Sequence, residues 1–195
     1  MQAILSGLGL STSAGLNAYL PLILMNLAAQ AGIIDTKGVP AEVLTSKPAL
    51  VVFLILLAIE TVADKIPAVD SVNDIINTAI RPTAGALMMV VSTSGMTGKV
   101  DPEVLTIFSL LAGGASAGSV HAVKATARPV VTVSTAGTGN MVVSVLEDIA
   151  AIFISLVALL APFFVLFFMA SFVALMLWWI WERQRKDMLR QRGLA

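Results

Sequence analysis

The stretch Leu146–Trp181, LEDIAAIFISLVALLAPFFVLFFMASFVALMLWWIW, is the most informative part of this sequence. From Ile149 onward it runs for 33 residues in which only two serines and Pro162 interrupt the apolar character. One helix of that length, at about 1.5 Å per residue, would measure about 50 Å, against roughly 30 Å for the hydrocarbon core of a bilayer. We therefore expect a helix break at Pro162, because proline lacks the backbone donor and clashes with the preceding turn.

The break leaves two spans, and the first of them carries charge near its start. Phe163–Trp181 has an ordinary length for a membrane helix, whereas Ile149–Ala161 is too short and must extend back to Met141. That extension brings Glu147 and Asp148 toward or into the membrane. Ionisable groups at that depth are costly, and they indicate a functional site by default.

The composition is that of a polytopic membrane protein. Of the 195 residues, 57% are hydrophobic and 12% are charged. The net charge is zero, which gives no reason to expect nucleic acid as a partner. Cysteine is absent, and one histidine cannot build the usual zinc site. Since GxSxG, HExxH and Walker motifs are also missing, we expect no enzyme, no metal site and no cofactor.

The apolar segments predict an all-α, polytopic transmembrane helix bundle of about six spans. The expected spans are Ala3–Ile33, Pro48–Val62, Pro82–Met96, Val104–Ala125, Met141–Ala161 and Phe163–Trp181. The first is interrupted by SGLGLSTSAGLNAYLP, and interrupted helices line a cavity or pack tightly. The third is short, so a re-entrant or half-span is the alternative. Residues 1–181 thus form a single transmembrane domain, and 182–195 a basic cytoplasmic tail.

An amphipathic helix is predicted between the second and third spans, at DSVNDIINTAIR (Asp70–Arg81). Its apolar residues share one helical face, and Asp70, Asp74, Asn77 and Arg81 share another. Such a helix lies flat in the membrane interface or folds back over the bundle.

Two short matches suggest an internal repeat of residues 1–98 with 103–181. Ser13–Gly15 matches Ser116–Gly118, and Ile59–Ala63 (IETVA) resembles Leu146–Ala150 (LEDIA). Three helices per repeat would invert the second half relative to the first, as in many small transporters. Chance matches in a chain rich in small residues are the alternative.

Lysine and arginine set the expected orientation. If both termini lie on one side, that side collects nine basic residues and the other side three: Lys65, Arg81, Lys124, Arg128 and the five from Arg183 to Arg192, against Lys37, Lys47 and Lys99. Nine against three predicts cytoplasmic termini. Three tryptophans at 178, 179 and 181 are typical of an interfacial anchor, and contact of the tail with anionic lipid is an alternative to plain topology-setting.

Polar residues at or near membrane depth form three groups. Two acids share a face at the end of the second span, three basic residues share a face of the fourth, and two acids open the fifth. The candidate substrate- or ion-binding residues are Glu60, Asp64, Lys65, Asp70, Asp74, Arg81, His121, Lys124, Arg128, Glu147 and Asp148. Because buried charges persist only when paired, the acids of the second and fifth spans should meet the basic face of the fourth.

Two interpretations of these charges stay open. They are either an interfacial ion-pair network that stabilises the fold, or a site where acids carry protons or cations and basic residues hold an anionic group. His121 is either a proton relay or a packing residue. For the small residues, close helix packing is favoured over ion coordination. The expected helix-break or packing residues are Gly15, Asn17, Pro21, Gly113, Gly114, Gly118 and Pro162.

Five segments together resemble a bacterial membrane-protein family labelled domain of unknown function 4126. They are GLNAYLPL (Gly15–Leu22), ETVADKIPAVDS (Glu60–Ser71), RPTAGAL (Arg81–Leu87), AGGASAGSVHAVKATARP (Ala112–Pro129) and NMVVSVLED (Asn140–Asp148). The resemblance implies a multi-pass protein of the inner membrane, and it implies no established activity. The tail after Trp181 lies outside the family pattern.

The leading functional prediction is a small transporter, channel or lipid-translocating protein with a charged site at the junction of spans two, four and five. The alternative is a structural or assembly subunit of a membrane complex that moves nothing, and an intramembrane enzyme ranks third. The expected partners are membrane lipids, a small solute or ion of unknown identity, and a second copy of the chain or another membrane protein.

Overall fold

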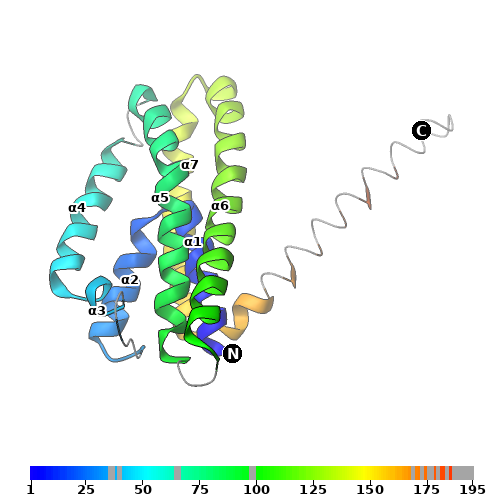
Figure 1. The fold of residues 1–195 in the computed structure, drawn as a ribbon. Helices are drawn as coiled ribbons and strands as arrows, with labels where there is room; N and C mark the ends of the chain where they lie inside the picture. The colour runs from blue at the N-terminus through cyan, green and yellow to red at the C-terminus, as the bar shows by residue number, and fades with distance from the viewer. Residues whose placement is uncertain are drawn as a thin grey trace.

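In a computed structural model the chain is helical, which confirms the predicted all-α class (Figure 1). The structure describes residues 1–34, 38, 41–63, 67–96, 100–167, 170–171, 174, 178, 181–182 and 185, with the backbone alone at 67–71 and 74. The elements are α1 (Gln2–Leu16), α2 (Tyr19–Gln30), α3 (Ala41–Leu44), α4 (Lys47–Ala63), α5 (Pro67–Thr93), the 3-10 turn η1 (Ser94–Met96), α6 (Pro102–Thr135) and α7 (Thr138–Leu160).

Three helical segments of the described chain are long and apolar enough to cross a bilayer, where six were expected. They are Ile75–Met96, Pro102–Thr135 and Thr138–Leu160. The first predicted span is divided into two short helices, and α4 has only 17 residues. Most of the sixth predicted span, Phe163–Trp181, lies outside the described residues.

The first predicted span is a helical hairpin instead of a crossing helix. With 15 and 12 residues, α1 and α2 measure about 22 and 18 Å at 1.5 Å per residue, too short for a bilayer core. Gln2 at the start of α1 and Ile33 just after α2 line the same cavity, so both open ends of the hairpin lie at one end of the bundle. Figure 1 shows the hairpin reaching only part of the way along the bundle. We call its turn, from Gly15 to Ala18, the hairpin tip.

A single side chain produces the hairpin tip. Asn17 leaves the helical conformation (φ −143°, ψ 124°), which ends α1. Its Oδ1 then accepts hydrogen bonds from the backbone N–H groups of Tyr19 and Leu20, both at 3.0 Å, and so caps the start of α2. Pro21 lies in the first turn of α2, where a missing N–H breaks no helical hydrogen bond. The predicted interruption is confirmed, and its position is Asn17.

The predicted amphipathic helix Asp70–Arg81 and the predicted third span are one continuous helix, α5, with Pro82 inside it. Membrane helices tolerate such prolines because neighbouring groups satisfy the freed carbonyl. In a soluble protein the apolar face of an amphipathic helix packs against the core, and here the opposite face does. Asn77 and Arg81 are buried, while Ile75 and Ile76 are exposed. The polar face therefore points into the bundle, and the prediction of a separate interfacial helix is wrong.

Small residues hold α5 against α6. A Cβ added to Gly113 of α6 would lie only 2.7 Å from the Met89 Cβ of α5, so only glycine fits there. A Cβ on Gly114 or Gly118 would have its nearest neighbour on Pro82 at 3.5 Å, an ordinary contact. Close packing thus accounts for Gly113, whereas the two other glycines of the predicted packing motif have room for a methyl group.

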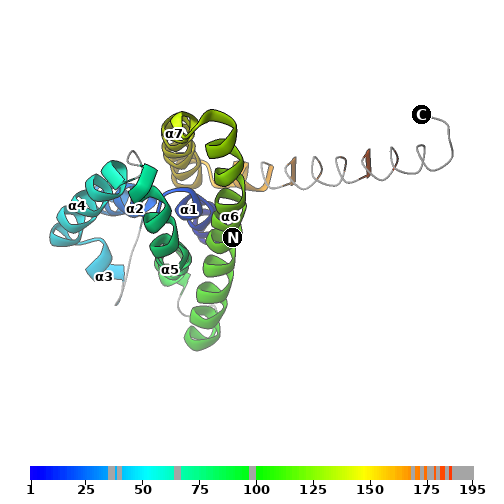
Figure 2. The same ribbon diagram turned by 90° about the horizontal axis from the view of Figure 1, so that it is seen from above.

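The core helix of the bundle is α1, which packs against α5, α6 and α7 (Figure 2). Its Gly15 is pressed against α6, because an added Cβ would lie 2.5 Å from the Ala117 carbonyl oxygen. The outer helices expose large apolar side chains along their outward faces, for example Val51 and Ile55 of α4 and Phe153 of α7. Apolar surface of this extent indicates a lipid-facing exterior.

The break predicted at Pro162 is confirmed. The last residue of α7 is Leu160, Ala161 is non-helical (φ −144°, ψ 61°), and helix resumes over 163–167. Trp179 and most of the basic tail lie outside the described residues.

The internal repeat is not confirmed. The hydroxyls of Thr12 and Ser116 lie 2.9 Å apart, and the Leu16 carbonyl accepts a hydrogen bond from Lys124 further along both helices. This order of contacts shows that α1 and α6 run in the same direction. The matching motifs at Ser13 and Ser116 therefore add no support for an inverted arrangement.

Candidate functional site

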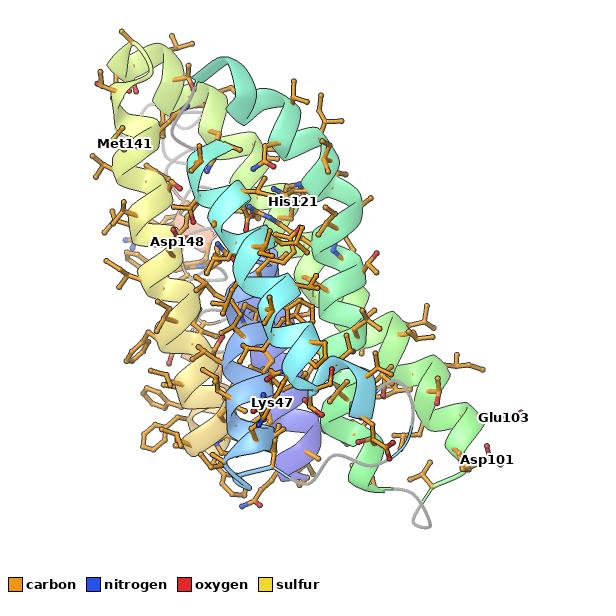
Figure 3. All side chains as sticks on the ribbon, turned by 90° about the vertical axis from the view of Figure 1, so that its left-hand side faces the viewer. Lys47, Asp101, Glu103, His121, Met141 and Asp148 are labelled. Carbon is orange, nitrogen blue, oxygen red and sulfur yellow. The ribbon has the colours of Figure 1, made fainter. Side chains whose placement is uncertain are left out.

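Charged side chains gather around the hairpin tip, about half-way along the long helices. We call this group the central charge cluster; its members are Glu60, Arg81, His121, Lys124, Arg128, Glu147 and Asp148. In Figure 3, His121 and Asp148 lie at similar heights, far from Asp101 and Glu103 at one end of the bundle. The charges were expected at helix ends on the cytoplasmic side, and in the structure Arg81, His121 and Lys124 lie within the continuous α5 and the long α6.

The first ion pair of the cluster joins α4 to α5. Arg81 donates from Nη2 to Glu60 Oε1 at 2.9 Å, and the two side chains are 0% and 2% exposed. Asn77 donates a further hydrogen bond to the same oxygen at 3.3 Å. Glu60 was expected to meet the basic face of the fourth span. The structure pairs it with Arg81 of α5, because the polar side chains of Asn77 and Arg81 turn inward.

The second ionic contact joins α6 to α7, and in it one acid binds two cations. We count it as the second ion pair. Lys124 Nζ lies 2.8 Å from Glu147 Oε2, and Arg128 Nη2 donates to the same oxygen at 3.2 Å. The i, i+3, i+7 spacing predicts one face for His121, Lys124 and Arg128, and all three are buried. The acid of the fifth predicted span thus meets the basic face of the fourth, as expected.

The hairpin tip connects the two pairs. Gly15 and Leu16 carry two of the last carbonyls of α1, which lack helical partners at the negative end of the helix dipole. The Gly15 oxygen accepts from Arg81 Nη1 at 3.2 Å, and the Leu16 oxygen accepts from Lys124 Nζ at 3.3 Å. Two cations from different helices therefore converge on adjacent carbonyls of the broken helix.

Asn17 and His121 complete these connections. Asn17 Nδ2 donates to Asp148 Oδ1 at 2.9 Å, so the residue that forms the tip also holds an acid of α7. Arg81 Nη1 lies 3.5 Å from His121 Nδ1, and His121 Nε2 lies 3.2 Å from the Thr78 hydroxyl. His121 of α6 thus contacts α5 beside the Glu60–Arg81 pair.

Four of the predicted site residues cannot be placed at the side-chain level. Asp64 and Lys65 lie outside the described residues. Asp70 and Asp74 lie on α5, where only the backbone of these two residues is described.

Sequence reasoning missed the polar contacts that lead along α1 to the tip. Ser11 donates to the Gly85 carbonyl at 2.7 Å, and Ser13 donates to the Ala151 carbonyl at 2.8 Å. Ser155 of α7 donates to the Ser13 hydroxyl at 2.8 Å. The sequence feature related to these contacts is the row of serine and threonine residues in the first predicted span. That row indicated tight helix packing, but it did not identify the helices that supply the partners.

A cavity of about 350 Å³ opens at the end of the bundle where the hairpin begins and ends. Its polar lining comes from Gln2, Ser6 and Ser92, and apolar residues that end α7 form another wall. The cavity lies away from the central charge cluster, whose ion pairs are in direct contact. The arrangement is thus a closed charged centre with an opening at one end of the bundle.

Comparison with known proteins identifies the family of this chain, but it assigns the chain no activity. No curated protein and no solved structure matches the chain. A family model described as Domain of unknown function (DUF4126) matches residues 4–182, and the chain belongs to that family.

Proposed function

We propose that the protein is a small membrane transporter whose solute site is the central charge cluster. The observation that carries the proposal is the hairpin tip, where a helix broken at Asn17 presents carbonyls to Arg81 and Lys124. Secondary transporters commonly place discontinuous helices of this kind at the membrane midplane, where the helix ends contact solutes or ions. Non-helical backbone at that depth is tolerated where it is enclosed by protein or lines a cavity.

The number of buried charges supports a functional role. Each ionised group removed from water costs several kcal/mol, and apolar side chains of similar volume often stabilise a fold equally well. Three buried cations, Arg81, Lys124 and Arg128, are therefore a costly way to hold the helices together. Intramembrane charges at such a cost are typical of transport pathways.

The cavity at the open end of the hairpin supplies a route of entry. It begins beside Ser6, and the hydroxyls of Ser11 and Ser13 lie further along α1 in the direction of the tip. A solute would follow α1 from this cavity to Arg81 and Lys124. The route is closed in this conformation, so transport requires movement of the hairpin or of α7.

We further propose a multi-pass location in a bacterial inner membrane with a cytoplasmic C-terminus. The count of nine basic residues against three needs correction, because Arg81, Lys124 and Arg128 are buried inside the bundle. If 163–181 crosses as its sequence predicts, Lys65 and the five basic residues of the tail share one side. Six basic residues on the side of the tail, against three on the other side, which include Lys47, still favour a cytoplasmic tail.

Since the hairpin does not cross, the N-terminus then lies on the opposite side from the tail. A periplasm-active reporter fused to each terminus tests this orientation. We expect activity from the N-terminal fusion alone, and activity from the C-terminal fusion contradicts the assignment.

Accessibility of the hairpin tip tests the transport proposal. The chain contains no cysteine, so a single introduced cysteine is labelled without background. We expect Ala18→Cys, fully buried in this conformation, to react with a membrane-impermeant maleimide in intact membranes, because a transporter opens its site to water. Leu111→Cys, on an outward apolar face, is the unreactive control, and Glu103→Cys at the exposed start of α6 is the reactive control. Labelling of Ala18→Cys only after denaturation contradicts the proposal.

A structural or assembly subunit is the second candidate, and the direct ion pairs favour it. The Lys124–Glu147 and Arg81–Glu60 contacts are short, as in a permanently closed network. In that case reconstituted protein moves no solute, and neutralising one member of a pair changes stability alone.

A further inference from the structure

We propose that the central charge cluster binds a small anion with carboxylate or phosphate oxygens, at the position that the Glu147 carboxylate now occupies. The proposal rests on the proposed function, because it names the solute class of the same site. In this conformation Glu147 is an internal anion that closes the site, and the incoming anion takes its place between Lys124 and Arg128.

Glu147 is shared by two cations. Two cations contact one carboxylate oxygen, Oε2, at 2.8 and 3.2 Å. Glu147 is also the most exposed member of the group: its side chain is 13% exposed, against 3% for Lys124 and 5% for Arg128. An acid that is less buried than the cations it neutralises is the member that can leave, while the cations stay fixed in the bundle.

Arg81 provides a further donor to the same region. It is fully buried, and its Nε has no hydrogen-bond partner among the described residues. Arg81 and Lys124 donate to the adjacent carbonyls of Gly15 and Leu16, so the two cations lie side by side at the tip. Arginine and lysine donors arranged in this way match the acceptor oxygens of carboxylates and phosphates.

The same geometry disfavours a cation as the solute. Glu60 already accepts from Arg81 and Asn77 and is enclosed with them. A cation that approached Glu147 would meet Lys124 and Arg128, and like charges at a few ångströms repel strongly in a medium of low dielectric constant. Asp148 is held by Asn17 at the tip. Lys124 and Arg128 therefore favour negative charge at the position of the Glu147 carboxylate.

Removal of the internal anion tests the proposal most directly. Glu147→Gln removes the carboxylate that Lys124 and Arg128 share, so the purified variant should melt below the wild type in chloride. Inorganic phosphate at equal ionic strength should then raise its melting temperature more than that of the wild type. The apparent Kd for phosphate should fall by about tenfold, because no internal carboxylate competes.

Two further variants separate binding from a general salt effect, since phosphate stabilises most proteins by exclusion from their surfaces. Glu103→Gln makes the same chemical change at the exposed start of α6, and it should respond to phosphate like the wild type. The Lys124→Met/Glu147→Gln pair removes one cation with the acid, so it should recover stability and lose the extra response. Equal phosphate responses in all variants overturn the proposal. If Glu147→Gln does not fold, the wild type is compared with the double variant, and equal responses again overturn it.

The source of the phosphate oxygens is resolved in lipid nanodiscs. Stabilisation of Glu147→Gln by inorganic phosphate in phosphatidylcholine discs identifies a soluble anion. Stabilisation by phosphatidylglycerol in phosphate-free buffer alone identifies a lipid headgroup, and an effect of neither overturns the proposal. Flux into proteoliposomes is read separately. Anion binding without flux removes the transport proposal and keeps the site, whereas flux without an anion response removes the anion site alone.

Discussion

The two ion pairs of the central charge cluster differ in enclosure and in the number of partners. Glu60 and Arg81 are sealed, with side chains 2% and 0% exposed. Glu147 is partly exposed and is shared by Lys124 and Arg128. A sealed pair between neighbouring helices joins α4 to α5, because separating its members strands both charges away from water. A shared acid at a partly open position can be exchanged for another anion. The Glu60 carboxylate therefore stabilises the bundle while the Glu147 carboxylate is exchangeable, and the carbonyls at the end of α1 contact one cation from each pair.

The largest effect is expected at the sealed pair. Glu60→Gln strands the fully buried Arg81, and we expect a loss of about 3–5 kcal/mol in the free energy of unfolding. Adding Arg81→Met should restore much of that loss, because no charge then remains unpaired. Denaturation of the purified variants in detergent measures both values. If the free energy of unfolding falls no more in Glu60→Gln than in Glu147→Gln, the two pairs do not differ in their contribution to stability.

A smaller loss, about 1–3 kcal/mol, is expected from Glu147→Gln, because this acid is partly hydrated and its amide can still accept a hydrogen bond. The same melting series measures it, with Lys124→Met/Glu147→Gln as the charge-balanced partner. If Glu147→Gln and Glu60→Gln lose equal free energies of unfolding, and phosphate stabilises neither variant, both ion pairs have a structural role alone.

The smallest effect is expected at the hairpin tip between the pairs. Asn17→Ala removes the cap of α2 and the hydrogen bond to Asp148, and we expect a loss of about 1–2 kcal/mol. Asn17→Ser retains a capping oxygen but cannot hold Asp148 in the same way, so it should recover only the capping part. If Asn17→Ser is as stable as the wild type, the Asn17–Asp148 contact contributes nothing measurable, and if it is only as stable as Asn17→Ala, the cap contributes nothing.

The amphipathic segment of α5 shows how far a sequence pattern leads. The spacing of Asp70, Asp74, Asn77 and Arg81 predicted one polar helical face, and helix covers this whole segment. The pattern does not say which face meets the core. In water the apolar face turns inward, whereas here Ile75 and Ile76 point outward and Arg81 is buried, since lipid can surround apolar side chains and cannot solvate a charge.

Features that depend on neighbours along the chain could be predicted from the residues alone. These are the helical class, the break at Pro162, the interruption near Asn17 and the common face of His121, Lys124 and Arg128. Each follows from backbone chemistry or helical periodicity within a few turns. Two outcomes came only from the tertiary fold. The interrupted segment folds back as a hairpin. Glu60 forms an ion pair with Arg81, and Glu147 forms ion pairs with two cations. Those outcomes depend on which helices pack together, because ion-pair partners are set by contacts between residues far apart in the chain, and no local pattern encodes them.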